Sequence, residues 1–208
     1  MDTGFELGIH IADVSHYVKK NSALDKEALK RGTSIYFPSG VIPMLPFELS
    51  NETCSLKPNL KRLTVTALID FDRKGKVVGS RFFNSIIKSR IRFTYNEVAR
   101  LLVKGNTDKK YAGFIGILKN MHQLSKMLRK QRFKSGSVDF QVPEPEIHMN
   151  SKGEVEKITK TQHNEAHKLI EEFMLAANQA VAKYLFNQKV PFIHRIHESP
   201  SEIKISAF

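Results

Sequence analysis

A proline-studded stretch, residues 32–60, places the strongest constraint on how this chain folds. It follows an alternating apolar run at residues 7–12 and contains four prolines: Pro38, Pro43, Pro46 and Pro58. Each proline holds φ at about −65° and cannot donate a backbone hydrogen bond, so the stretch is poorly suited to helices and central strands. We predict that residues 32–60 are mostly loop and keep one shape, as loops that present a surface to a ligand often do.

Around this stretch, the chain switches between strand and helix patterns. Strands are predicted at residues 7–12, 63–70, 77–92, 146–150, 154–160 and 190–196. Helices are predicted at residues 22–31, 94–103, 111–130 and 164–187, from capping residues and apolar spacing. Hairpins interspersed with helices favour an α+β fold, in which an antiparallel or mixed sheet is packed by two long helices. No internal repeat or composition shift divides the chain, so residues 1–208 are predicted to belong to one domain.

The formal net charge of +12 is concentrated in residues 81–134. This stretch holds fourteen basic side chains, and its only acidic ones are Glu97 and Asp108. Such a concentration is typical of proteins that bind a polyanion. Aromatic residues in the same stretch favour nucleic acid, because bases stack on aromatic rings. A solvated basic surface that binds nothing specific is the alternative.

Other classes of protein fit the sequence poorly. No apolar run comes close to the length of about 18 residues that a membrane span needs. No leader of the secretory type is evident, so we predict a cytoplasmic protein without membrane contact. The single cysteine, Cys54, excludes a disulfide within the chain and any zinc site that needs several cysteines. We interpret Cys54 as a small buried apolar residue.

Several sequence blocks match one known family closely. They read IHIADVSHYV from residue 9, RGTSIYFP from residue 31, VIPMLP from residue 41, and CSL from residue 54, with further matches at IKSR, YNEV and HKLIEE. In these blocks the whole chain resembles the catalytic domain of the ribonuclease II / ribonuclease R (RNB) family, and most of all its ribonuclease R branch.

The resemblance implies a processive, magnesium-dependent 3′→5′ exoribonuclease that hydrolyses RNA to nucleoside 5′-monophosphates. The family holds magnesium with a D-x-D-D cluster that lies before the strand at residue 5 of this chain, and it carries a later arginine motif after residue 208. We therefore expect a central part of a catalytic domain, without catalytic or metal-binding residues of its own and inactive by itself. Asp2 is given no metal role. Two-metal chemistry needs several carboxylates that converge on ions about 4 Å apart. The sequence near residue 5 contains no such dense cluster of acidic residues.

The expected partner is single-stranded RNA, and six residues are predicted to bind it: Tyr36, Phe82, Phe83, Lys88, Arg90 and Arg92. The resemblance implies that Tyr36 packs against the 3′-terminal nucleotide. Phe82 and Phe83 point to opposite faces of a regular strand, so one is predicted to be core and the other to stack on a base. Arg90 and Arg92 share a face, and guanidinium groups match phosphate oxygens well. For the two arginines, a solvated strand surface is an equal alternative.

Two further residue pairs and one single residue are predicted to have no catalytic role. His167 and Glu171 have the i, i+4 spacing of metal ligands, but no third ligand is evident. Ser15 and His16 are neighbours that face opposite ways on a strand. Asp13 is predicted to make structural hydrogen bonds. Two alternative functions stay open: a non-catalytic single-stranded RNA-binding module, and a scaffold that contacts proteins or the ribosome, with which the parent protein could associate.

Overall fold

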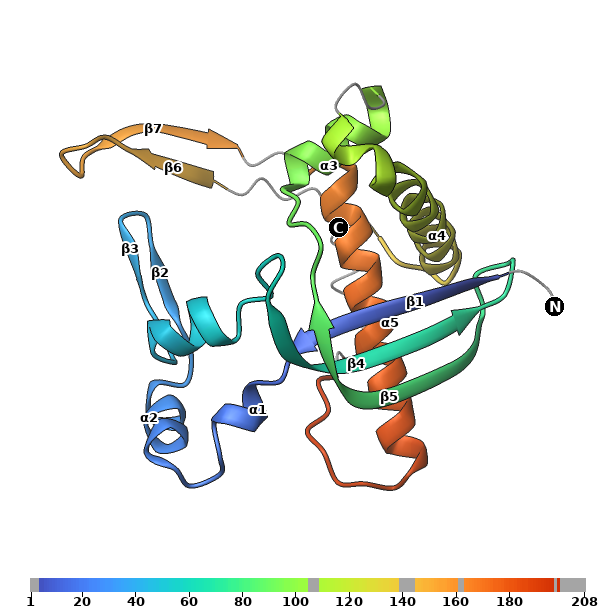
Figure 1. The fold of residues 1–208 in the computed structure, drawn as a ribbon, viewed down its shortest axis with the longest axis horizontal. Helices are drawn as coiled ribbons and strands as arrows, with labels where there is room; N and C mark the ends of the chain where they lie inside the picture. Colours follow the sequence, from blue (N-terminus) through green and yellow to red (C-terminus); the bar gives the residue numbers. More distant parts are fainter. Residues whose placement is uncertain (1–3, 105–108, 139–144, 161–162, 197, 199–208) are drawn as a thin grey trace.

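A three-stranded antiparallel sheet forms the centre of the molecule (Figure 1). The computed structural model describes residues 4–104, 109–138, 145–160, 163–196 and 198. The strands are β1 (Phe5–Ala12), β4 (Lys61–Phe71) and β5 (Val77–Lys88), in the order β1-β4-β5. Leu7 lies opposite Ile69, which in turn lies opposite Ser80, so residues of the same face align across the sheet.

Two long helices cover one face of this sheet. They are α4 (Ile115–Lys134) and α5 (Glu165–Asn187), and Figure 1 shows α5 crossing behind the strands. The main core joins all three parts and consists of Leu7, Ile69, Phe71, Leu124, Leu169 and Phe173. Burying each such side chain contributes about 1.5–3 kcal/mol, which makes this layer the main source of stability.

A smaller core forms where α3 (Tyr95–Lys104) and the 3₁₀ turn η2 (Lys109–Phe114) meet α4. Thr94 and Glu97 cap α3 reciprocally, because Thr94 N donates to Glu97 Oε2 at 2.7 Å and Glu97 N donates to Thr94 Oγ1 at 3.3 Å. The buried Tyr111 donates its hydroxyl proton to Glu97 at 2.7 Å. The Thr94 amide, the Tyr111 hydroxyl and the Thr94 hydroxyl lower the pKa of Glu97 to about 2.

Two hairpins and a short helical segment extend from this body. After β1 come α1 (Val14–Tyr17), α2 (Ala23–Arg31), the hairpin β2 (Ile35–Phe37) and β3 (Gly40–Ile42), and the π-helical turn η1 (Glu48–Thr53). Gly32 ends α2 with φ +73°, a conformation that side chains disfavour. The second hairpin is β6 (Pro145–Met149) with β7 (Val155–Lys160). Both hairpins lie on the left in Figure 1, away from α4, where β6–β7 extends to the left and β2–β3 points upward.

The α+β class, the antiparallel strands and the two long helices predicted from the sequence are confirmed. Part of the polar loop that the sequence predicts at residues 135–145 and most of the chain after residue 196 lie outside the described residues. Within the described part, none of the helices combines the length and the hydrophobicity that a bilayer crossing needs.

Two predicted elements are wrong in detail, and a third is refined. Residues 32–60 are mostly loop, as predicted, but they also contain a hairpin and a π-helical turn, since the prolines sit beside the strands and leave their ladder bonds free to form. The strand predicted at residues 77–92 ends at Lys88, because its partner β4 begins opposite it at Lys61. Residues 190–196 form no strand, since no neighbouring strand pairs with them in the described structure; Ile193 is 97% exposed.

Candidate nucleic-acid interface

The tyrosine selected from the sequence, Tyr36, stands on the outer surface of the β2–β3 hairpin. It is 81% exposed and lies opposite Val41 in the hairpin ladder. Its neighbours Ile35 and Phe37 are 48% and 53% exposed. An aromatic ring with a free face and a hydroxyl can stack on a base and hydrogen-bond sugar or phosphate. The hairpin thus presents Tyr36 in the way that contact with a nucleotide requires.

Polar contacts to the backbone hold this hairpin at its base. Arg31 Nη1 donates to the carbonyl of Pro43 at 2.8 Å, while its Nε donates to Glu27 Oε1 at 2.8 Å. Met44 N donates to Ser34 Oγ at 2.9 Å. Arg31 therefore connects the last turn of α2 to Pro43, the residue that directly follows β3. The sequence prediction of a stiff segment relied on the prolines alone and did not include this arginine.

The two adjacent phenylalanines of β5 face opposite sides of the sheet. The ring of Phe82 lies 4.9 Å from that of Tyr184 on α5, so Phe82 faces the helical layer. Phe83 is 44% exposed and lies opposite Thr66 on the other face. Between the two candidates, Phe83 is the one whose ring is more available to a base.

The three cationic candidates lie at and beyond the end of β5. Lys88 is exposed at the last position of the strand. Arg90 and Arg92 are exposed outside it, in a segment where Ile91 and Phe93 pack against the smaller core. The alternation of inward and outward side chains predicted for these arginines is therefore kept, although the backbone has left the sheet.

Asp13 joins the sheet to the segment that carries the hairpin. It is 6% exposed, and its carboxylate accepts hydrogen bonds from Ser15 Oγ at 2.7 Å, His16 N at 3.1 Å and Asn84 Nδ2 at 3.2 Å. The Ser15 hydrogen bond is the main cause that lowers the pKa of Asp13. Burial, and then the charge of Asp13, raise the pKa of Cys54. Asp13 thus makes the structural hydrogen bonds predicted for it.

An aromatic stack that the sequence did not reveal lies where α3 and α5 begin. The rings of Tyr95 and His167 are 3.9 Å apart and inclined by 20°, and Tyr95 is 46% exposed. Burial and the neighbouring His163 lower the pKa of His167, which favours the neutral imidazole. Tyr95 is one of the aromatic residues of the basic stretch, but its partner His167 is distant in the sequence. Only the fold brings the two rings together.

His167 and Glu171 do not form a joint ligand pair. His167 Nδ1 accepts from Asn164 N at 3.2 Å in the N-terminal cap of α5, whereas Glu171 accepts from Arg132 Nη2 at 2.9 Å. Within the ranges that the structure describes, no three His, Cys, Asp or Glu side chains gather into a possible metal site. Asp2 lies outside those ranges. The described residues therefore supply no donor set that fits magnesium.

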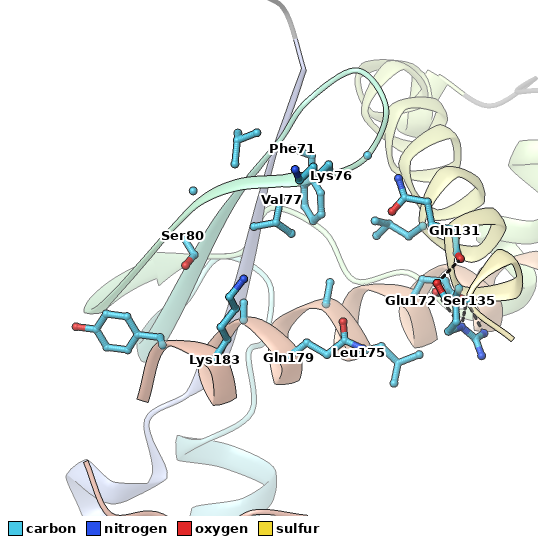
Figure 2. Close-up of a pocket in the computed structure, with 18 of the residues that line it drawn as sticks. Phe71, Lys76, Val77, Ser80, Gln131, Ser135, Glu172, Leu175, Gln179 and Lys183 are labelled. Atoms are coloured by element: carbon cyan, nitrogen blue, oxygen red, sulfur yellow. Dashed lines mark hydrogen bonds and ion pairs between the residues drawn. The ribbon is translucent and has the colours of Figure 1, made fainter. Parts of the chain in front are cut away.

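An open groove of about 720 Å³ lies on another part of the molecule, between the start of β5 and the helices α4 and α5 (Figure 2). Val77, Leu175 and Ala176 contribute apolar surface, and Lys76 and Lys183 line it as well. Glu172, which is 3% exposed, closes one end, where it accepts from Arg132 Nη2 at 2.6 Å. None of the six predicted RNA-binding residues lines this groove.

Comparison with known proteins gives a consistent result. The family model described as RNB domain matches residues 1–208. Ribonuclease R of Escherichia coli (strain K12) is 42% identical over 207 residues, which cover 99% of this chain and 25% of the relative. The chain thus spans about a quarter of the length of this curated relative.

Solved structures agree with this match. Mycoplasma genitalium RNase R in complex with ribose methylated single-stranded RNA has a TM-score of 0.93 and 38% identity, over 100% of this chain and 32% of that one. The same protein in complex with double-stranded RNA also gives a TM-score of 0.93 and 38% identity, over 100% of this chain and 37% of that one.

Proposed function

This chain belongs to the RNB domain family, and we propose that it forms part of the RNA-holding surface of a 3′→5′ exoribonuclease of the ribonuclease R type. In this proposal, Tyr36 packs against the nucleotide at the 3′ end. Phe83 offers a second ring, while Lys88, Arg90 and Arg92 contact phosphates. The partner is single-stranded RNA, as the complex of the Mycoplasma genitalium relative suggests.

The exposure of Tyr36 is the observation that carries the proposal. The ring of Tyr36 is 81% exposed and lies on a hairpin whose base is held by the Arg31 hydrogen bond, so it contributes little to the stability of the fold. Large exposed apolar side chains that occur together, as Ile35, Tyr36 and Phe37 do, mark surfaces of interaction. Stacking on a base would use the ring face that the hairpin leaves open.

The test is the affinity of the 208-residue chain for a short oligo(A), measured by fluorescence anisotropy. We expect Tyr36→Ala to weaken binding by about 1–3 kcal/mol, the usual contribution of one base stacked on an aromatic ring. Phe186→Ala removes a 69% exposed aromatic ring from α5 and serves as the matched control, with little expected effect. Equal losses in both variants, or no loss in either, would exclude Tyr36 as the contact.

We further propose that the parent enzyme uses magnesium, and that this chain by itself does not hydrolyse RNA. The described residues bring no carboxylate cluster together, which supports the proposal. Incubation with labelled RNA and magnesium should leave the RNA intact, whereas a longer polypeptide with the adjoining parts of the RNB domain should shorten it from the 3′ end. Magnesium-dependent degradation by the 208 residues alone would contradict this.

The same observation favours one alternative, a module that binds single-stranded RNA without cutting it. If the longer polypeptide also bound RNA with a salt-dependent affinity but left it intact under all metal conditions, the alternative would hold.

A further inference from the structure

Helix α4 is unusually one-sided in charge. Its twenty residues contain no aspartate or glutamate and six basic residues: Lys119, Lys126, Arg129, Lys130, Arg132 and Lys134. Helices exposed to solvent commonly balance such charges with acids three or four positions away. Acidic residues that neutralise the positive charge of α4 must therefore lie on other helices, strands or turns.

The fold compensates the arginines of α4 and leaves its lysines exposed. Arg132 forms ion pairs with Glu172 at 2.6 Å and Glu171 at 2.9 Å, both on α5. Arg129 approaches Glu172 to 3.9 Å, and its side chain is only 19% exposed. The four lysines, in contrast, are all exposed. Glu171 and Glu172 of α5 thus meet the arginines between the two helices.

Helical geometry puts these lysines on the side opposite the core. At 100° per residue, Lys119, Lys126 and Lys130 fall within a sector of about 40°, whereas the core residues Met121, Leu124 and Leu128 lie about 120–180° away. At 1.5 Å of rise per residue, the row from Lys119 to Lys130 is about 16 Å long. Among the three, Lys126 is near Glu165, whose carboxylate already accepts from Lys168 Nζ at 3.1 Å.

The turn between β4 and β5 extends this row. Gln131 of α4 donates a hydrogen bond from Nε2 to the carbonyl of Lys74, so the turn docks beside the lysines. Gly75 has φ +78°, and a Cβ there would come within 3.1 Å of Gln131 Nε2, which explains why the close contact has a glycine. Lys74 and Lys76 flank this glycine and are exposed.

We propose that these six lysines, the α4 ridge (Lys74, Lys76, Lys119, Lys126, Lys130 and Lys134), bind the phosphate backbone of RNA at a second place. In Figure 1, α4 and the β4–β5 turn, which carry the ridge, lie on the side of the molecule away from the β2–β3 hairpin. Lysine ammonium groups act as point charges without base recognition, so the contact is independent of sequence. This inference rests on the proposed function, because it assumes that RNA is the polyanion the chain meets.

The test compares two RNA lengths and two charge-matched variants of the full 208-residue chain. One variant removes the α4 lysines of the ridge (Lys119→Gln, Lys126→Gln, Lys130→Gln, Lys134→Gln). The other removes four exposed lysines scattered over other elements (Lys19→Gln, Lys152→Gln, Lys157→Gln, Lys189→Gln). Binding to a 5-nucleotide and a 25-nucleotide oligo(A) is measured by anisotropy from 50 to 200 mM salt, after circular dichroism has confirmed that both variants fold.

We expect the ridge variant to lose affinity for the 25-mer and the scattered variant to lose much less. Four phosphate contacts to a single strand account for a roughly 50-fold loss of affinity between 50 and 200 mM salt, so the salt dependence of the ridge variant should be shallower by about that factor. Binding of the 5-mer should depend on Tyr36 and change little in the ridge variant.

Four outcomes would overturn the inference. Equal losses in the two variants would indicate a general effect of net charge, and an unchanged ridge variant would exclude the ridge. Displacement of the 25-mer by polyglutamate as effectively as by unlabelled RNA would assign the ridge to acidic proteins instead. If the wild-type chain binds neither RNA, the proposed function fails as well, and this distinguishes the two failures.

Discussion

The sheet-and-helix body and the arm that carries Tyr36 are built on different principles. The body consists of β1, β4, β5, α4 and α5, and the residues of its main core, such as Ile69 and Phe173, are 0–7% exposed. The arm, residues 23–53, is described throughout and contains one buried residue, Leu49. All three residues of β2 are exposed.

The difference shows which interactions stabilise the conformation of each region. Burial of apolar surface stabilises the body. The conformation of the arm is held by hydrogen bonds to the backbone, such as those of Arg31 with Pro43 and of Ser34 with Met44. The apolar side chains of the arm are consequently free to face a ligand. A region that does not depend on its large side chains for stability can use them for binding.

The largest expected effect contrasts the two regions directly. Phe173→Ala should lower the free energy of unfolding by about 3–5 kcal/mol, because it leaves a cavity under the sheet. Tyr36→Ala should change the same quantity by less than about 0.5 kcal/mol, as substitutions on an exposed surface do. Urea denaturation followed by circular dichroism measures both. A comparable loss in the two variants would show that the arm is part of the core.

A smaller effect is expected at the base of the arm. Arg31→Gln removes the ion pair to Glu27 and the hydrogen bond to Pro43, at a cost on the order of 1 kcal/mol in local stability. Amide hydrogen exchange in β2 and β3 should become faster, while exchange in β4 stays unchanged. Lys30→Gln, one position earlier on α2, is the control. If both variants exchange alike, Arg31 does not hold the hairpin.

The smallest effect concerns α3 in the body and appears only in acid. The pKa of Glu97 is lowered from its ordinary value of 4.5 to about 2, so its bonds stabilise the folded state fully above pH 4.5. This contribution is lost as the pH falls from 4.5 towards 2, because the unfolded state then binds the proton first. The melting temperature of Glu97→Gln should fall less over this range than that of the wild type.

Glu156→Gln, which removes a carboxylate from the exposed strand β7, should leave the acid dependence as it is in the wild type. If the melting temperature of Glu97→Gln fell with pH as steeply as that of the wild type, the capping carboxylate would have an ordinary pKa.

Local sequence signals predicted much of the fold. Ser22 and Asn164 cap α2 and α5 where expected, and the turn from Asp72 to Gly75 joins β4 to β5. Each signal acts over a few residues, so it survives without knowledge of the rest of the chain. The end of β5 and the fate of residues 190–196 were mispredicted because a strand exists only where a distant partner pairs with it.

The candidate site was predicted only in part. Tyr36 was selected through its motif, and its role stays a prediction. The opposite directions of Phe82 and Phe83 follow from strand geometry. Which phenylalanine meets α5, and that Tyr95 stacks on His167, depends on helices that lie far along the chain.

By itself, the sequence determined the family, the α+β class and an excess of positive charge, since these follow from motifs, periodicity and composition. The tertiary structure decided how that charge is used. Pairing of α4 with α5 neutralises Arg132 at Glu172 and turns the lysines outward, because helix packing selects which face of each helix is buried. The apolar spacing of α4 already indicates which face its lysines share, but the pairing of Arg132 with Glu172 arises only when two distant segments bury their apolar faces against one sheet.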